Sequence, residues 1–399
     1  MSSFIIPVRA KSFCDDSYSG EKIGFAIIAR QNFDRQGSDM RTKPLFSGYV
    51  LSLVILLLGA SGCAPISAPG ASNGSGLPIS RTYFAFDTIV TVKVYDERVT
   101  DAHFKELESL MKEIEGKLSR TIETSDVSQV NLQAGQEAVR VSDETFGLVR
   151  QAVGYAELTD GRFDPAIGPL VDLWQIGKEG AKVPPQADIE RKRDLVDFRN
   201  IETDETNRTV KLAQSGMSID LGGIGKGYAA DRIAERLLEM GFKSAIIDLG
   251  GNIMAVGTKP GGELWNIGIQ APDEMRGNPI GQIRVDNQTI VTSGVYERYF
   301  MENGQRYHHI LDTKTGYPVR NELISVTIVA DRSADADALS TAAFALGLEE
   351  GLQLTQSLDR VEALFVTAER KVYMTDGLIK SFRLTDETYE LANLAAKAN

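Results

Sequence analysis

A glycine-rich segment, residues 219–231, constrains this chain more than any other part of its sequence. Four glycines occur from Gly222 to Gly227, directly before residues with helical spacing, and Lys226 lies among them. Glycine lets the backbone approach a ligand closely, and a helix N-terminus offers N–H groups and a positive dipole to an anion. The segment therefore predicts a strand-to-helix turn that binds a diphosphate, or the same turn without a ligand.

Two known phosphate-binding patterns can be compared with this segment. A Walker A loop would need a glycine in place of Asp220 and a serine or threonine directly after Lys226. The looser dinucleotide fingerprint does fit Gly225, Gly227 and Ala230, and the acidic Asp248 follows about 20 residues later. No run of alternating parallel strands and helices surrounds it, however, so a Rossmann domain is the disfavoured alternative.

A second segment, residues 334–343, combines one carboxylate with two hydroxyls on a helix of small residues. Asp337, Ser340 and Thr341 stand at positions i, i+3 and i+4, so their oxygens share one helix face. Such a face suits a magnesium ion that completes its shell with waters and a substrate phosphate. An exposed polar helix face without a metal is the alternative interpretation.

Two further segments carry residue types suited to catalysis or ligand binding. The only histidine pair, His308 and His309, lies just before a turn at residues 314–318, and histidine suits proton transfer near neutral pH. A structural role is the alternative, and the more common one for a histidine near a turn. The aromatic and proline-rich segment 161–174 is expected either to line the binding site of a flat ring or to be a packed loop.

Cysteine, histidine and charge exclude several other classes of protein. Two cysteines and three histidines in 399 residues support neither a disulfide framework nor a zinc site. Any metal is therefore expected to be a hard, oxygen-liganded cation. The net charge is −12 and there is no basic run, so no nucleic-acid partner is expected.

The N-terminal part of the chain has the pattern of an export signal. A short basic stretch at residues 40–44 precedes an apolar run at residues 49–60 and then Cys63. That run is shorter than the roughly 20 residues that a transmembrane helix needs. The residues before Cys63 resemble a lipobox, so we expect a lipid anchor at Cys63 and a location at the cell inner membrane, on the periplasmic side. A plain cleaved signal or an uncleaved anchor is the alternative.

The chain is accordingly divided into four parts. Residues 1–39 form a doubtful upstream extension with Met40 as the expected start, 40–63 a lipoprotein signal, 64–80 a flexible tether rich in Ala, Gly, Ser and Pro, and 81–399 the folded domain. Hydrophobic periodicity within the domain predicts helices at 104–118, 142–158, 228–240 and 334–346. It also predicts strands at 84–95, 244–249, 253–256, 265–269, 289–292, 323–330, 361–367 and 371–375. The predicted fold class is α+β, with mixed, largely antiparallel sheets and packed helices.

Five motifs follow one another along the domain: Phe163-Asp164-Pro165 with Gly168-Pro169-Leu170-Val171-Asp172-Leu173-Trp174, then residues 220–228, residues 248–252, His309-Ile310-Leu311-Asp312 with Thr315-Gly316, and residues 335–341. In this order they resemble the motifs of the ApbE family of FAD:protein FMN transferases. The resemblance runs from about Phe84 to about Gly377. It implies transfer of FMN from FAD to a Ser or Thr hydroxyl of an acceptor protein, with release of AMP.

The resemblance also implies roles for particular residues. Mg²⁺ would be bound by the side chains of Asp337 and Thr341, the main-chain carbonyl of Gly223, and Ser340. Contacts with FAD would come from Phe86, Asp126, Val127, Ser128, Asp164, Pro165, Ala166, Asp220, Lys226 and His309. The catalytic residues would be Asp337, through the metal, and His309 as the base, with Asp312 in reserve.

The partners implied by the resemblance are exported flavoproteins, above all subunits of ion-pumping redox complexes. Two alternatives to the transferase remain at this point. One is an FAD hydrolase of the same fold, in which water replaces the acceptor hydroxyl. The other is a flavin-binding lipoprotein without catalytic activity.

Overall fold

The computed structural model describes residues 77–272 and 277–393 of the chain. The expected upstream extension, export signal and anchor at Cys63, and nearly all of the tether, lie outside the described residues. The first strand begins at Ile79, two residues before the expected start of the domain. In the described ranges, no helix is both long and apolar enough to cross a membrane.

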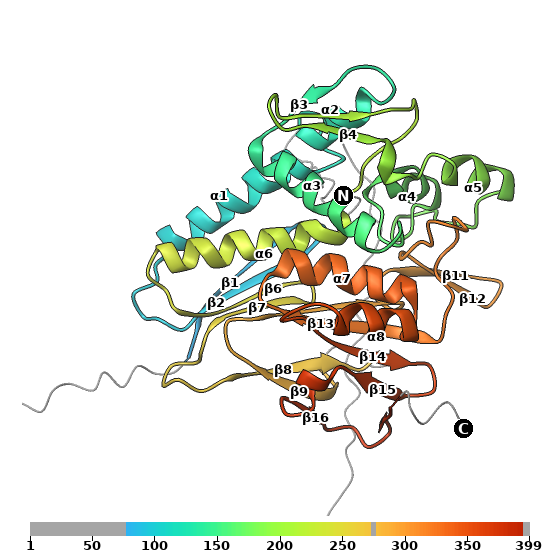
Figure 1. Ribbon diagram of the computed structural model, residues 1–399. Helices are drawn as coiled ribbons and strands as arrows, with labels where there is room; N and C mark the ends of the chain where they lie inside the picture. The colour runs from blue at the N-terminus through green and yellow to red at the C-terminus, as the bar shows by residue number, and fades with distance from the viewer. Residues whose placement is uncertain (1–76, 273–276, 394–399) are drawn as a thin grey trace, which may run out of the picture. The chain divides into compact units, whose positions relative to one another are not determined.

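A nine-stranded sheet forms the centre of the described part (Figure 1). Its strands, in spatial order, are β1 (Ile79–Ala85), β2 (Thr88–Val94), β6 (Ser244–Leu249), β7 (Asn252–Gly257), β10 (Thr289–Gly294), β13 (Leu323–Ala330), β14 (Glu362–Thr367), β15 (Lys371–Met374) and β17 (Glu390–Leu391). Every neighbouring pair is antiparallel except β15 and β17, which are parallel. The predicted fold class, α+β with largely antiparallel sheets, is confirmed.

Helices cover one face of this sheet and a small sheet covers the other (Figure 1). The helices that pack on the first face are α1 (Asp101–Leu118), α6 (Gly222–Glu239), α7 (Ser333–Leu346) and α8 (Leu348–Gln356). The small sheet has the order β16 (Phe382–Leu384), β9 (Pro279–Val285) and β8 (Trp265–Gln270). Strand β13 is buried on both faces, because Ile328 packs toward the helices and Val329 toward the small sheet.

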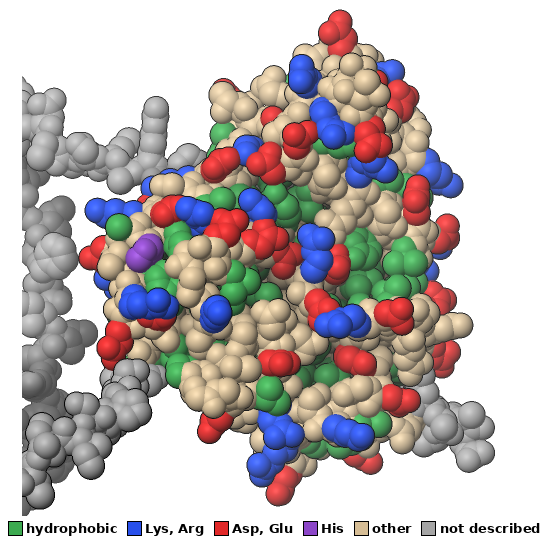
Figure 2. Space-filling model, turned by 60° about the vertical axis from the view of Figure 1, so that its left-hand side comes forward, with side chains coloured by type: hydrophobic (Ala, Val, Ile, Leu, Met, Phe, Trp, Pro, Cys, Tyr) green, Lys and Arg blue, Asp and Glu red, His purple; other side chains and the backbone are tan. Residues whose placement is uncertain are grey.

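The remaining elements lie beyond the helical face and at one end of the sheet (Figure 1). They are α2 (Asp126–Leu132), α3 (Asp143–Leu158), α4 (Gly168–Trp174), α5 (Gln186–Arg193), the hairpin β11 (Tyr299–Glu302) with β12 (Gln305–His308), and the sheet of β3 (Val139–Arg140), β5 (Thr209–Leu212) and β4 (Ile201–Asp204). Short 3₁₀ turns occur at Pro165–Ile167, Phe198–Asn200 and Asp376–Leu378. Figure 2 shows one face of the molecule, on which basic and acidic side chains are interspersed and apolar ones lie in the recesses between them.

Most of the predicted elements are confirmed, with two informative differences. The strand predicted at 84–95 is the end of β1, a turn at Phe86 and Asp87, and β2; both turn residues have positive φ, 55° and 60°, which no periodicity reveals. The helix predicted from residue 228 begins six residues earlier, at Gly222. Its glycines are therefore not a loop before the helix, as expected, but its first turns.

Candidate functional site

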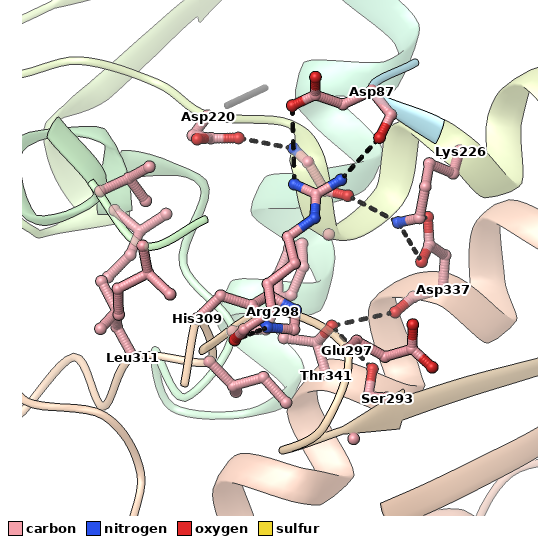
Figure 3. Close-up of a pocket in the computed structure, with 18 of the residues that line it drawn as sticks. Asp87, Asp220, Lys226, Ser293, Glu297, Arg298, His309, Leu311, Asp337 and Thr341 are labelled. Carbon is pink, nitrogen blue, oxygen red and sulfur yellow. Dashed lines mark hydrogen bonds and ion pairs between the residues drawn. The ribbon is translucent and has the colours of Figure 1, made fainter. Parts of the chain in front are cut away.

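A cavity of about 330 Å³ opens where α6, α7, the β1–β2 turn and the segments around β10 and β12 meet (Figure 3). Seven residues predicted for the site lie on its wall: Asp164, Asp220, Gly223, Lys226, His309, Asp337 and Thr341. These residues come from four separate stretches of the sequence. The fold thus brings the glycine-rich segment and the acidic helix face together, as the sequence-based interpretation requires.

Close packing of α6 on α7 fixes this arrangement. A Cβ atom at Gly227 would lie 2.0 Å from the carbonyl oxygen of Ser333, so only glycine fits the helix crossing. Asp231, one turn further along α6, accepts hydrogen bonds from the backbone N–H groups of Ser333 (2.7 Å) and Ala334 (3.0 Å) and so caps α7. Burial raises the pKa of Asp231 to about 6.

Asp337 is the most buried acidic group on the cavity wall, with 3% of its surface exposed. Its carboxylate accepts a hydrogen bond from the backbone N–H of Gly227 at 2.9 Å and lies 3.2 Å from Nζ of Lys226. Lys226 also donates to the carbonyl oxygen of Gly222 at 3.2 Å. A buried carboxylate is stable only with such partners, so α6 supplies both the charge and the donor that hold Asp337.

Hydroxyl groups lie next to the backbone carbonyl of Asp337. Ser293 on β10 is 2.8 Å from Oγ of Ser340 and 3.4 Å from Oγ1 of Thr341, and Ser340 also donates to the backbone carbonyl of Asp337 at 3.0 Å. A Cβ at Gly223 would stand 3.6 Å from Oγ1 of Thr341, which places that backbone beside the hydroxyl.

These oxygen donors fit a hard divalent cation better than a thiolate or imidazole metal. Asp337, Thr341 and the Gly223 backbone supply a carboxylate, a hydroxyl and a carbonyl within one small region of the wall. Across residues 77–272 and 277–393, no group of three His, Cys, Asp or Glu side chains is placed to hold a metal. A magnesium site here would therefore rest on one carboxylate and on uncharged oxygens.

The start of α6 is fixed by a buried ion pair. Asp220 accepts a hydrogen bond from the backbone N–H of Gly222 at 2.7 Å, which caps the helix, and its other oxygen lies 3.2 Å from Arg120. The side chains of Arg120 and Asp220 are 6% and 4% exposed, and Arg120 also pairs with Asp172 at 2.5 Å. The sequence did not single out Arg120, which lies 100 residues from its partner.

Asp164 shapes the loop between α3 and α4. Its carboxylate accepts hydrogen bonds from the backbone N–H groups of Ala166 (2.7 Å) and Phe198 (3.0 Å). Burial outweighs these bonds and raises the pKa of Asp164 to about 7. Pro165 and Ala166 are buried behind it, and the neighbouring Phe163 ring would lie only 2.9 Å from a Cβ at Gly223.

His309 follows β12 and is held by the backbone of Arg298. The carbonyl oxygen of Arg298 accepts from the His309 N–H at 3.1 Å and lies 3.3 Å from Nδ1. Because a carbonyl can only accept, Nδ1 carries the proton and Nε2 keeps a free lone pair. His309 is an exposed residue on the cavity wall. Desolvation by the surrounding protein, with the charge of Arg298 acting in the same direction, lowers the pKa of its ring.

Asp312, the reserve candidate for a base, is occupied in a turn. One oxygen accepts from the backbone N–H groups of Lys314 (2.7 Å) and Thr315 (3.1 Å), and the other lies 3.5 Å from Arg162. His309 is therefore the better placed of the two, since it lies on the cavity wall with an open lone pair.

Seven predicted site residues do not belong to the described cavity wall: Phe86, Asp126, Val127, Ser128, Pro165, Ala166 and Ser340. Phe86 is fully buried, although the next two residues, Asp87 and Thr88, reach the cavity. Asp126 accepts hydrogen bonds from Ser142, which caps α3, and from Thr145. Contact of the first six residues with FAD, and of Ser340 with a metal ion, stays a prediction.

Sequence reasoning missed several polar residues of the cavity wall, among them Asp87, Asn252, Ser293 and Arg298. Asn252 lies in one of the five motifs, but the motif implied no role for it; it is 3% exposed, and its buried Nδ2 has no hydrogen-bond partner among the described residues. Ser293 lies near the end of β10 and Arg298 shortly after that strand. Their closeness to a strand end is the one sequence feature that could have pointed to them. Asp87 was hidden within a strand prediction that proved to contain a turn.

Comparison with known proteins gives the same family from three directions. The sequence pattern of the ApbE family matches residues 86–365. A protein of Treponema pallidum (strain Nichols) named FAD:protein FMN transferase is 36% identical over 355 residues, covering 85% of this chain and 96% of the relative. A protein of the same name from Klebsiella pneumoniae (strain 342) is 37% identical over 309 residues, covering 77% and 95%.

Solved structures agree with these relatives. The ApbE protein of Thermotoga maritima superposes with a TM-score of 0.71 at 34% identity, covering 77% of this chain and 99% of that one. The flavinyl transferase ApbE of Pseudomonas stutzeri, in its apo form, superposes with a TM-score of 0.67 at 29% identity, covering 77% and 98%.

Proposed function

This chain belongs to the ApbE family and is an enzyme of the FAD:protein FMN transferase type, and we propose that it transfers FMN from FAD to a serine or threonine hydroxyl of an acceptor protein, with Mg²⁺ bound and with release of AMP. The observation that carries this proposal is the meeting of Asp337, Lys226 and the Gly223 backbone on one cavity wall. A metal-binding carboxylate and a cation then lie where one dinucleotide diphosphate would reach both.

The metal would be held by the carboxylate of Asp337, the hydroxyl of Thr341 and the carbonyl of Gly223. When bound, Mg²⁺ would neutralise charge on the diphosphate and on the departing AMP. Ser340 would help to position Asp337, because its hydroxyl donates to the backbone carbonyl of Asp337 and lies 2.8 Å from Oγ of Ser293.

The protein residues supply positioning and proton transfer. Lys226 offers its charge to a phosphate oxygen once the carboxylate of Asp337 has a second cation as partner. The acceptor hydroxyl oxygen forms a bond to the phosphorus of the FMN half, and the bond from that phosphorus to the bridging oxygen breaks, so that AMP leaves with that oxygen. Nε2 of His309 takes the hydroxyl proton, since its lone pair is open and its lowered pKa keeps the ring neutral.

The setting of the reaction is a further part of the proposal. The signal-like residues before Cys63 support export and a lipid anchor at the cell inner membrane, with the enzyme on the periplasmic side. The acceptors would then be exported flavoproteins, such as subunits of ion-pumping redox complexes.

Co-expression of the full chain with such an exported subunit tests the proposal. We expect mass spectrometry to find one FMN added to a single Ser or Thr of the subunit, and AMP to be released in equal amount. Replacing that Ser or Thr with Ala should prevent the addition. Release of AMP without labelled acceptor would identify an FAD hydrolase instead, and binding of FAD without AMP release would identify a non-catalytic flavin-binding protein.

A further inference from the structure

Arg298 on the cavity wall reaches Asp87 in the turn between β1 and β2 (Figure 3). Its Nη2 donates to the backbone carbonyl of Asp87 at 3.3 Å, and its Nη1 lies 3.8 Å from the Asp87 carboxylate. The two residues are 211 positions apart in the sequence, and both line the cavity. The guanidinium is therefore held at the cavity by an acidic residue of the β1–β2 turn.

This ion pair is the loosest of those made by the cations of the cavity wall. Among the described residues, that wall has three cations, Arg162, Lys226 and Arg298. Lys226 lies 3.2 Å from a carboxylate that is 4% exposed, and Arg162 lies 3.5 Å from one that is 18% exposed. The side chains of Arg298 and Asp87 are 29% and 36% exposed at 3.8 Å, and such a pair contributes little stability.

The backbone of Arg298 is fixed although its side chain is loosely held. Its carbonyl oxygen accepts from the N–H of His309 at 3.1 Å and lies close to Nδ1 of the same residue. The guanidinium can thus exchange its partner by rotation of side-chain bonds, without moving the backbone that positions His309. Arg298 also acts on His309 electrostatically, as Lys226 does, so both cations lie near that ring.

We propose that Arg298 is a substrate-binding residue that leaves Asp87 to pair with a diphosphate oxygen of FAD, and that Asp87 competes with FAD for the guanidinium. This inference deepens the proposed function and rests on FAD as the substrate. A diphosphate brings two negative charges, and Lys226 alone, already beside Asp337, leaves one of them without a protein cation. The planar fork of arginine suits paired hydrogen bonds to phosphate oxygens.

The test is a comparison of two substitutions that break the same ion pair from opposite sides. Dissociation constants of FAD, ADP and riboflavin are measured on the full chain with Mg²⁺ present, for wild type, Arg298→Gln, Arg298→Lys and Asp87→Asn. We expect Arg298→Gln to weaken the binding of FAD and ADP by about 10- to 100-fold. The affinity for riboflavin, which has no diphosphate, should be unchanged. The affinities of Arg298→Lys for FAD and ADP should lie between those of wild type and Arg298→Gln, because lysine keeps the positive charge but lacks the planar guanidinium group.

The direction in which Asp87→Asn changes the affinity for FAD decides between the two roles of the ion pair. If Asp87 competes for the guanidinium, this variant should bind FAD and ADP about 2- to 5-fold more tightly than wild type, by population shift toward the free guanidinium. If the ion pair only stabilises the cavity wall, both Asp87→Asn and Arg298→Gln should weaken the binding of all three ligands. That result, or unchanged FAD affinity in Arg298→Gln, would overturn the inference.

A matched pair away from the cavity serves as the control. Arg98 and Asp96 form an ion pair at 2.6 Å after β2, and neither residue lines the described cavity. Arg98→Gln and Asp96→Asn should leave all three constants unchanged. Suppose that Arg298→Gln weakens FAD binding, Asp87→Asn strengthens it, and the enzyme never labels an acceptor. That result would contradict the proposed transfer reaction and support the inference about Arg298. A wild type that does not bind FAD would overturn both.

Discussion

The backbone N–H of Gly227 on α6 donates a 2.9 Å hydrogen bond to the buried carboxylate of Asp337 on α7. The same glycine lets the two helices touch, because a Cβ there would meet the Ser333 carbonyl at 2.0 Å. One residue therefore both permits the helix crossing and orients the carboxylate proposed to bind the metal. The geometry of the site depends on this crossing more than on any loop.

Substitution of Gly227 by Ala should disturb stability and activity together. The new methyl group would meet backbone rather than a flexible side chain, so α6 and α7 must move apart. We expect the free energy of unfolding to fall by about 1–3 kcal/mol and AMP release from FAD to fall at least tenfold. Urea unfolding and a coupled assay for AMP measure the two effects.

Gly154 in α3 is the matched control for that substitution. A Cβ at Gly154 would meet no atom within 4 Å, and the residue is exposed on its helix. Gly154→Ala should raise the free energy of unfolding by about 0.5–1 kcal/mol, through the lower flexibility of the unfolded chain, and leave AMP release unchanged. Equal losses in the two variants would contradict a special role for the helix crossing.

Removal of the imidazole should lower the rate and change its dependence on pH. A base acts in its neutral form, and the pKa of His309 lies below its ordinary range because of desolvation and nearby cations. The wild-type rate with bound Mg²⁺ should thus stay level as the pH falls from 8 through about 6.5, where an ordinary histidine would lose half its activity. We expect His309→Gln to reduce kcat by about 10²- to 10⁴-fold with FAD binding retained.

The measurement for His309 is a profile of kcat against pH for both proteins. A wild-type profile that drops around an ordinary histidine pKa, and a variant without that drop, would show that His309 titrates normally and would contradict the stated environment. An unchanged kcat in His309→Gln would exclude it as the base.

Asp164 should make stability depend on pH in a defined direction. Burial raises its pKa from 3.8 in the unfolded chain to about 7 in the folded protein, so the folded state holds the proton more tightly. Its contribution is fully present below pH 3.8 and is lost as the pH rises through 7, by up to about 4 kcal/mol. Asp164→Asn should remove this slope and leave a constant offset, because asparagine does not titrate.

Urea unfolding of wild type and Asp164→Asn at several pH values between 4 and 8 measures this difference. The stability of the wild type relative to the variant should fall with rising pH. A difference that stays constant across that range would show that the backbone donors at Ala166 and Phe198 keep the carboxylate ionised throughout.

Loss of Arg120 should destabilise the start of α6. Its buried guanidinium pairs with Asp220, which caps that helix, and with Asp172. Arg120→Met should lower the free energy of unfolding by about 3 kcal/mol, since a buried carboxylate loses its cation. The double variant Arg120→Met with Asp220→Asn should recover part of that loss in urea unfolding; no recovery would contradict coupling of the two charges.

Periodicity predicted the regular elements that have a clear hydrophobic pattern. The strand at residues 244–249 coincides with β6, and that at residues 323–330 with β13, because β-branched residues are frequent in both. The helix at residues 142–158 is α3 with its N-cap at Ser142. The motifs indicated the family, and through it they predicted that Lys226 and Asp337 share one site, where the fold does bring them together.

Packing decided what the sequence could not show. The sequence predicts a turn before the helix at the glycines of α6, yet they form its first turns, where close contact with α7 at Gly227 outweighs the low helix propensity of glycine. Asp87 and Arg298 meet only because a turn and a loop 211 residues apart converge at the cavity. Asp126 is predicted to contact FAD, and in the structure its carboxylate accepts hydrogen bonds from the hydroxyl groups of Ser142 and Thr145.

A magnesium titration of AMP release, with Asp337→Asn beside wild type, tests whether Asp337 holds the metal ion that the reaction needs. Asp335→Asn is the matched control, because it changes a carboxylate on the same helix that lies off the cavity wall. We expect wild type and Asp335→Asn to require Mg²⁺ and to saturate alike, and Asp337→Asn to release AMP at least 10³-fold more slowly and to need far more Mg²⁺, with FAD still bound. The same rate and magnesium requirement in all three proteins would contradict this role of Asp337.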